Sequence, residues 1–302
     1  MKRIFTSAAA ILLSFLLLCG ANVPAFADAM APIAENAELC TYRNTSVGGQ
    51  LTAYNGDGKG LRFELLTKPV KGDVELQEDG SFVYTPRQNK KGKDYFGFRA
   101  VDSEGRSSQE ATVIITINKQ KTDVSYSDMD GEPSAYAALL LEEKGIYTGQ
   151  KLCGRYVFCP NEPISRGDFL AMCMTLAGKK TVSSVMFTDY ADDDSIPDWM
   201  KGYVAAAAMD GFAGGSVSES GTDFCPTTPV SRRDAQIMLD RALGLKSVAY
   251  GYDVESEDAE WLQACANLNA YGIIKEGRLL ESTLTRGEAA MLLASVAEKL
   301  GG

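Results

Sequence analysis

A four-residue pattern recurs three times in the second half of this 302-residue chain: a hydroxyl residue, an arginine, any residue and an acid. The three copies are Ser165-Arg166-Gly167-Asp168, Ser231-Arg232-Arg233-Asp234 and Thr285-Arg286-Gly287-Glu288. Each copy is preceded by one apolar residue and followed by apolar residues at helical spacing. The recurrence predicts tandem structural repeats, in which no single unit can bury its apolar face without its neighbours.

The spacing around the pattern supports this prediction. Gly145 lies 21 residues before Arg166, and Gly211 lies 21 residues before Arg232. The third copy is shorter, since Gly272 lies only 14 residues before Arg286, and it lacks the Phe-Cys-Pro sequence found at 158–160 and 224–226. We therefore expect repeats at 124–180, 184–245 and 248–300. Helical apolar spacing predicts two helices in each repeat, at 135–144, 168–177, 200–209, 234–243, 260–270 and 287–300.

The first and fourth residues of each copy fit a capping box, in which a hydroxyl and an acid exchange hydrogen bonds with backbone amides at a helix start. The predicted capping pairs are Ser165 with Asp168, Ser231 with Asp234, and Thr285 with Glu288. Such a cap contributes about 1 kcal/mol. The arginine needs a separate explanation, because it occupies the first helical position, where the helix dipole disfavours a cation.

Two explanations for the arginines remain open. Free amides at a helix start, together with a guanidinium group, form a binding site for a carboxylate or a phosphate. Alternatively, the arginines form ion pairs with Asp128, Asp189 or an acid of another repeat and hold the repeats together. The first explanation predicts a ligand site, and the second predicts a structural contact.

Aromatic residues add two further signals. An aromatic-x-Asp sequence precedes the first helix of each repeat: Tyr126-Ser127-Asp128, Phe187-Thr188-Asp189 and, less clearly, Tyr250 to Asp253. Trp199 and Trp261 open the first helices of the second and third repeats. A tryptophan at such a position stacks on a sugar ring or, more commonly, packs in the core.

Taken together, these sequences resemble the S-layer homology (SLH) domain, in three tandem copies over residues 124–300. The resemblance implies an all-α pseudo-trimer in which one helix per copy builds a central bundle. It also implies grooves that bind the secondary cell-wall polysaccharide of Gram-positive-type bacteria, often through pyruvate ketals, without catalysis or a cofactor. The implied contact residues are Arg166, Arg232, Arg286, Asp128, Asp189, Trp199 and Trp261. Arg233 departs from the small residue usual after the arginine, and it either adds charge to its groove or blocks it.

The first half of the chain has a different period. Short runs of alternating apolar residues at 61–66, 72–76, 81–85, 95–101 and 111–117 are separated by turns rich in glycine and aspartate. This pattern predicts an all-β sandwich over 34–118, followed by a polar linker at 119–123. The stretch resembles bacterial immunoglobulin-like or cadherin-like modules, some of which bind calcium through acidic turns. Here Asp57, Asp94 and Asp102 form no dense Asp-x-Asp cluster, so we expect turn-forming acids and no metal site.

Composition restricts the function. Residues 1–27 read as a secretory signal peptide: Lys2 and Arg3, a short apolar run, and then Ala25-Phe26-Ala27. No other stretch reaches the roughly 20 apolar residues that a membrane helix needs. The formal charge of −10 makes nucleic acid a poor partner, and the absence of histidine removes most nucleophilic and metal-dependent catalytic sites. Outside the signal peptide lie six cysteines, whose pairing the sequence leaves open: Cys40, Cys153, Cys159, Cys173, Cys225 and Cys265.

These observations predict a secreted, non-catalytic protein of two parts, an Ig-like sandwich displayed by a triple repeat that anchors it to anionic wall polysaccharide. The alternative is an adhesin or surface-assembly protein, whose sandwich binds a protein partner while the repeats serve as scaffold. A small wall enzyme that uses paired carboxylates is disfavoured, because the chain has no histidine and no third domain, and acids are too common to identify such a pair.

Overall fold

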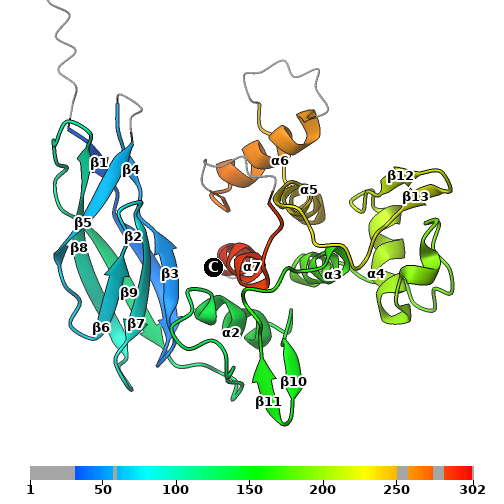
Figure 1. The fold of residues 1–302 in the computed structure, drawn as a ribbon, viewed down its shortest axis with the longest axis horizontal. Helices are drawn as coiled ribbons and strands as arrows, with labels where there is room; N and C mark the ends of the chain where they lie inside the picture. Colours follow the sequence, from blue (N-terminus) through cyan, green and yellow to red (C-terminus); the bar gives the residue numbers. More distant parts are fainter. Residues whose placement is uncertain (1–30, 57–59, 250–257, 275–281, 301–302) are drawn as a thin grey trace, which may run out of the picture.

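The computed structural model describes residues 31–56, 60–249, 258–274 and 282–300. An all-β region comes first, and a region with six helices follows, as Figure 1 shows. The predicted change from strands to helices is therefore confirmed. The proposed signal peptide, Asp57 and the third aromatic-x-Asp sequence (250–253) lie outside the described residues.

Two sheets form the β region. One has the strand order β2 (Ala37–Tyr42), β9 (Ala111–Asn118), β8 (Gly92–Asp102) and β5 (Leu61–Thr67). The other has the order β3 (Val47–Gln50), β7 (Ser81–Pro86) and β6 (Gly72–Leu76). A further short pair joins β1 (Ile33–Ala34) to β4 (Ala53–Tyr54). β2 runs parallel to β9, with Leu39 opposite Ile115, whereas the other pairs are antiparallel.

The core of the sandwich lies between these sheets. Val113, Ile115 and Ile117 on β9 are buried, while the residues between them are only half-buried, as the alternation of the sequence predicts. Phe82 and Phe96 meet edge to face, with their ring centroids 5.2 Å apart, and so join the two sheets.

The six helices are α2 (Ala135–Glu143), α3 (Arg166–Leu176), α4 (Asp198–Met209), α5 (Arg232–Leu243), α6 (Ala259–Ala270) and α7 (Arg286–Leu300). All six correspond to predicted helices, and each bound falls within two residues of the prediction. A short 3₁₀ helix, η1 (Asp193–Ser195), precedes α4.

Two short hairpins were not predicted: β10 (Gln150–Leu152) with β11 (Arg155–Val157), and β12 (Ser216–Ser218) with β13 (Gly221–Asp223). The first turns through Cys153 and Gly154, with φ values of 50° and 81°. Positive φ at both central residues is the geometry of a type I′ turn, for which Cys-Gly is a much weaker signal than Asn-Gly.

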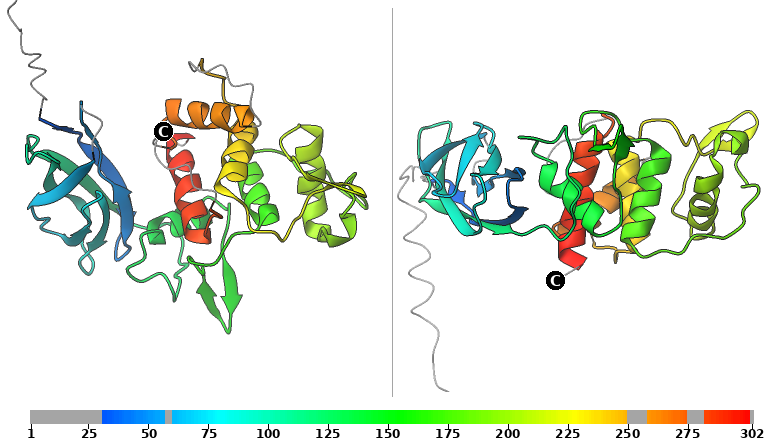
Figure 2. Two further views of the ribbon diagram at one scale, coloured as in Figure 1. Left: turned by 45° about the horizontal axis from the view of Figure 1, so that its top comes forward. Right: turned by 90° about the horizontal axis from the view of Figure 1, so that it is seen from below.

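The helices interlock between repeats. α3, α5 and α7 lie together at the centre of the helical region, and α2, α4 and α6 lie around them (Figures 1 and 2). Each outer helix packs on the central helix of a different repeat: α2 on α7, α4 on α3, and α6 on α5. Because the first helix of the region packs on the last, the three repeats close into a ring.

The sandwich packs directly on α2, whose residues 135–141 are all buried. The amide of Tyr136 donates to the carbonyl oxygen of Ser46 at 3.1 Å, and the amide of Gly48 donates to that of Pro133 at 2.8 Å. A Cβ atom on Gly48 would lie 2.7 Å from the Cβ of Pro133, so only glycine permits this close approach. The two halves of the protein are therefore in intimate contact.

Among the described residues, no helix is long and apolar enough to cross a membrane.

Candidate functional site

The three hydroxyl-Arg-x-acid motifs meet at one place, where the central helices begin. The apolar residues just before the motifs are buried and form a closed cycle of backbone hydrogen bonds, each 3.0 Å long. In this cycle Ile164 donates to Leu284, Leu284 donates to Val230, and Val230 donates to Ile164. The cycle fixes all three helix starts around one centre.

The hydroxyl groups cap these helices. The side chain of Ser165 accepts a hydrogen bond from the amide of Asp168, and Ser231 does the same for Asp234. The third motif has both bonds of a capping box: Thr285 accepts from the amide of Glu288 at 3.2 Å, and the Glu288 carboxylate accepts from the amide of Thr285 at 2.9 Å.

The expectation of free amides at the helix starts is wrong. The amides of Arg166, Arg232 and Arg286 donate to the carbonyl oxygens of Thr228, Ser282 and Glu162, at 2.8, 3.0 and 2.8 Å. The amides of Gly167 and Gly287 donate to Pro226 and Pro160 in the same way. A loop of a neighbouring repeat thus occupies the position that an anion would take, because closing the ring brings that loop onto the helix start. Any anion must be bound by the arginine side chains instead.

Arg166 is held by the next repeat. Its guanidinium group forms an ion pair with Asp234 at 3.1 Å, donates to the carbonyl oxygen of Gly214, and lies over the ring of Phe224. Only 13% of its side chain is exposed. It lines a cavity of about 200 Å³, together with a second ion pair between Arg241 and Glu260. Charges of both signs therefore balance in this cavity.

Arg232 has an equivalent arrangement. Its guanidinium group forms an ion pair with Glu288, the acid of the third motif, and its Nε donates to the hydroxyl of Ser282 at 2.9 Å. In two of the three motifs, the arginine is thus neutralised by the motif acid of the following repeat.

Arg286 differs from the other two. Its Nη1 donates to the carbonyl oxygens of Phe158 and Cys159, at 2.8 and 3.3 Å. In the described part of the chain it forms no ion pair, and Asp168, the corresponding acid, accepts a hydrogen bond from the hydroxyl of Ser165. Burial raises the pKa of the nearby Tyr147 hydroxyl, and the positive charge of Arg286 partly offsets that rise. This site therefore holds a cation that no carboxylate neutralises.

The aromatic-x-Asp sequences fix the loops. Both oxygens of Asp128 accept hydrogen bonds from the amides of Phe158 and Cys159, at 2.6 to 3.0 Å. Its predicted counterpart in the second repeat, Asp189, is exposed and does not hold the equivalent loop, while its proposed contact with polysaccharide stays a prediction. Asp192 takes this role instead, accepting from the amides of the second Phe-Cys pair at 2.7 and 2.8 Å.

The correct sequence in the second repeat is therefore Tyr190-Ala191-Asp192. Tyr190 packs on Phe224 with ring centroids 5.5 Å apart, as Tyr126 packs on Phe158 at 5.4 Å. The signal was present in the sequence three residues later, but Phe187-Thr188-Asp189 matched the same pattern. Phe187 is 75% exposed, which excludes it from the buried role.

The two tryptophans occupy different environments. Trp199 is 57% exposed and meets Tyr203 edge to face. Of the two roles left open for it, packing in the core is therefore excluded, and contact with a sugar ring stays a prediction. Trp261 is half-buried, and its indole nitrogen donates to Gln236 at 2.7 Å. Arg233 lies over the ring of Trp261 and forms an ion pair with Asp258. Arg233 therefore contacts two residues of the third repeat, Trp261 and Asp258.

A buried ion pair stabilises the loop before α4. Lys201, only 7% exposed, forms an ion pair with Asp193 at 2.7 Å. Together with a hydrogen bond from Thr188, this pair lowers the pKa of Asp193 to about 2. No sequence pattern described above marks this pair.

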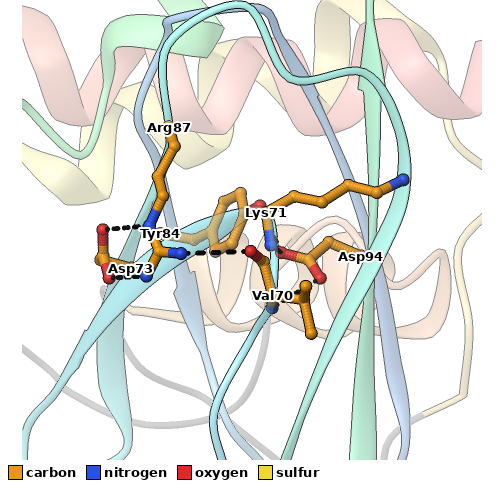
Figure 3. Close-up of polar contacts among 6 residues, drawn as sticks. All are labelled: Val70, Lys71, Asp73, Tyr84, Arg87 and Asp94. Atoms are coloured by element: carbon orange, nitrogen blue, oxygen red, sulfur yellow. Dashed lines mark hydrogen bonds and ion pairs between the residues drawn. The ribbon is translucent and has the colours of Figure 1, made fainter.

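The acids considered for calcium serve the sandwich. Figure 3 shows Asp94 accepting hydrogen bonds from the amides of Val70 and Lys71, at 3.0 and 2.8 Å. It also accepts from the hydroxyl of Tyr84 at 2.8 Å, while Arg87 is paired with Asp73. Asp102 is bonded in a similar way to Arg106 and to the turn that follows it. No group of three potential metal ligands occurs among the described residues, and none of the six cysteines described there is paired.

Comparisons with known proteins agree with part of this picture. Residues 28–119 match the family model of the bacterial cadherin-like domain. The Surface-layer 125 kDa protein of Lysinibacillus sphaericus is 26% identical over 144 residues, which are 45% of this chain and 12% of that protein. The chain thus spans a small fraction of this relative. The sandwich is a cadherin-like domain, and the two matches indicate a surface protein.

Likenesses to solved structures are weak. An SrpA adhesin variant from Streptococcus sanguinis is 16% identical, with a TM-score of 0.26, covering 33% of this chain and 64% of that chain. The D00-D0 domain of Intimin is 16% identical, with a TM-score of 0.24, covering 31% and 50%. Scores this low give no information on function.

Proposed function

We propose that the helical region is a set of three SLH repeats, which attach the protein non-covalently to an anionic cell-wall polysaccharide. The region holds the cadherin-like sandwich at the cell surface and catalyses no reaction. The observation that carries this proposal is the ring of motifs, in which each arginine lies against a loop or acid of the neighbouring repeat. Such a ring places each guanidinium group at a boundary between repeats, where a polymer can contact both.

The grooves are expected to contribute unequally. An arginine bound to a carboxylate must give up that partner before it binds an acidic sugar, and the exchange yields little net free energy. Among the described residues, Arg286 is bound to carbonyl oxygens and to the hydroxyl of Tyr147 but to no carboxylate, so its remaining N–H groups can form a charge-assisted pair with a ligand carboxylate. We therefore assign the main anion contact to Arg286, between the third and first repeats.

The relative supports the location without identifying the ligand. A surface-layer protein and a cadherin-like domain both indicate the cell surface. Binding to wall polysaccharide is one way in which a protein is held at that surface.

A pull-down with purified wall material tests the proposal. We expect the full chain to sediment with wall material and to stay in solution after hydrofluoric acid has removed the wall polysaccharide. Chemical reduction of the carboxyl groups of the polymer should also release it, because the reduced polymer offers no anion to a guanidinium group. The experiment with carboxyl-reduced polymer changes only the polymer, so the protein keeps its fold.

Arg286→Gln provides the matching protein variant, with Arg155→Gln, at the exposed first residue of strand β11, as a control for the loss of one positive charge. The first should weaken sedimentation, and the second should not. Undiminished binding to carboxyl-reduced polymer would contradict the proposal.

A further inference from the structure

A second cavity lies where the sandwich, the linker and α2 meet, away from the motif ring. Its volume is about 300 Å³, at the lower end of the range for small-molecule sites. Its walls come from the turn after β2, the segment 120–130 and one side of α2. The polar lining residues are Arg43, Asn44, Thr45, Gln120, Ser125 and Asp130.

Arg43 is unusual in this cavity. Its Nε is buried without a hydrogen-bond partner, as is the Nε of Arg166. Unlike Arg166, however, Arg43 forms no ion pair through the rest of its guanidinium group within the described ranges. Every other half-buried arginine there donates to a carboxylate or a carbonyl oxygen: Arg99, Arg106, Arg166, Arg232, Arg241 and Arg286. Buried polar groups are normally paired, because an unpaired one costs about 1 to 3 kcal/mol. An unpaired guanidinium group lining a cavity therefore points to a ligand.

The other polar groups indicate the kind of ligand. Asn44 uses its Oδ1 to accept from the amide of Asn89 at 2.7 Å, which leaves its NH₂ group available. Asp130 is exposed and lines the same cavity, yet it forms no ion pair with Arg43. The cavity thus presents a cation and a hydrogen-bond acceptor at separate points. A ligand with one carboxylate and several hydroxyl groups satisfies both, whereas a simple inorganic anion satisfies only the cation.

We propose that this junction cavity binds one acidic sugar residue, with its carboxylate on Arg43 and its hydroxyl groups donating to Asp130. The proposal rests on the proposed function for the source of the sugar, since an acidic wall polymer would supply it. It adds a contact on the sandwich itself, so the cadherin-like domain takes part in holding the polymer.

The experiment uses the full chain and D-glucuronate as the probe, with D-glucose and inorganic phosphate as comparisons. Binding is followed by NMR through the amide signals of Asn44, Ser125 and Asp130, which report on this cavity alone. We expect glucuronate to shift these signals saturably, and glucose and phosphate to shift them at least tenfold more weakly. Arg43→Gln should weaken glucuronate binding at least tenfold, and Asp130→Asn should weaken it less. Arg155→Gln should leave it unchanged.

Several results would overturn this inference. These are no shift with glucuronate, equal binding of phosphate, or undiminished binding by Arg43→Gln. If Arg43→Gln fails to fold, the Asp130→Asn variant and the phosphate comparison still decide the question. A negative result for the junction cavity does not refute the proposed function, because wall sedimentation depends on Arg286 and is measured separately. If the chain sediments with wall material but does not bind glucuronate at the junction, only the junction site is refuted.

Discussion

Arg166 and Arg286 occupy the same position in the first and third motifs, yet the structure gives them opposite electrostatic environments. Arg166 is nearly buried and paired with Asp234 of the second repeat. Arg286 lies against two carbonyl oxygens without a carboxylate partner among the described residues. A motif shared by all three repeats thus serves to hold the ring together in one groove and leaves a cation available in another. The same sequence pattern does not imply the same role.

The largest effect is expected from Arg286→Ala. Loss of one charge-assisted contact in a partly dry groove costs about 1.5 to 3 kcal/mol, which is roughly a 10- to 150-fold loss of affinity for wall polysaccharide. The free energy of unfolding should fall much less. Titration with soluble polymer measures the first quantity, and urea unfolding measures the second. A variant that loses stability but not affinity would show that Arg286 is structural.

Arg166→Ala should show the reverse pattern. Its removal breaks an ion pair, a hydrogen bond to Gly214 and the contact with the Phe224 ring. We expect a loss of about 2 kcal/mol in the free energy of unfolding, seen as a lower midpoint in urea. Affinity for polymer should change less than in Arg286→Ala. If the affinity losses were equal, the contrast between the two grooves would be refuted.

Asp234→Asn should make the first groove resemble the third, in which the motif arginine has no carboxylate partner among the described residues. The substitution removes the carboxylate that neutralises Arg166 while keeping an oxygen at the third residue of α5. We expect a gain of a few-fold in affinity for acidic polymer, with a loss of about 0.5 to 1 kcal/mol in stability from the weaker helix-dipole interaction. Unchanged or reduced affinity would indicate that Arg166 cannot reach the ligand even when released.

The smallest effect concerns the Lys201–Asp193 pair, in which the cation has a carboxylate partner, as Arg166 does. Because the pKa of Asp193 is lowered from 3.8 to about 2, the pair stabilises the fold above pH 4 and loses this contribution as the pH falls toward 2. Asp193→Asn should therefore be less stable than the unsubstituted chain at neutral pH, with the difference closing between pH 4 and 2. Thermal unfolding across that range measures it. A difference independent of pH would mean that the carboxylate charge is not involved.

The sequence alone predicted the local elements well. Periodicity located all six helices, and alternation located five strands of the sandwich, because both signals lie within a few consecutive residues. It missed the two hairpins and chose Asp189 instead of Asp192, since two neighbouring stretches matched one short pattern. It also left open whether Trp199 packs in the core, because periodicity cannot show whether a neighbouring element covers a given face.

The amino-acid sequence therefore determined that the chain has a β half, three helical repeats and a hydroxyl at each central helix start. Only the folded arrangement shows that neighbouring loops occupy the helix-start amides and that α2 closes the ring on α7. It also shows that, among the described residues, Arg286 and Arg43 have no carboxylate partner. The physical reason is the separation along the sequence over which each interaction acts. Capping and periodicity act over three or four residues, whereas the partner of an arginine lies 56 residues away for Arg232 and 127 or more for Arg286. Which charges are paired, and so which can bind a ligand, is fixed by contacts that no local pattern records.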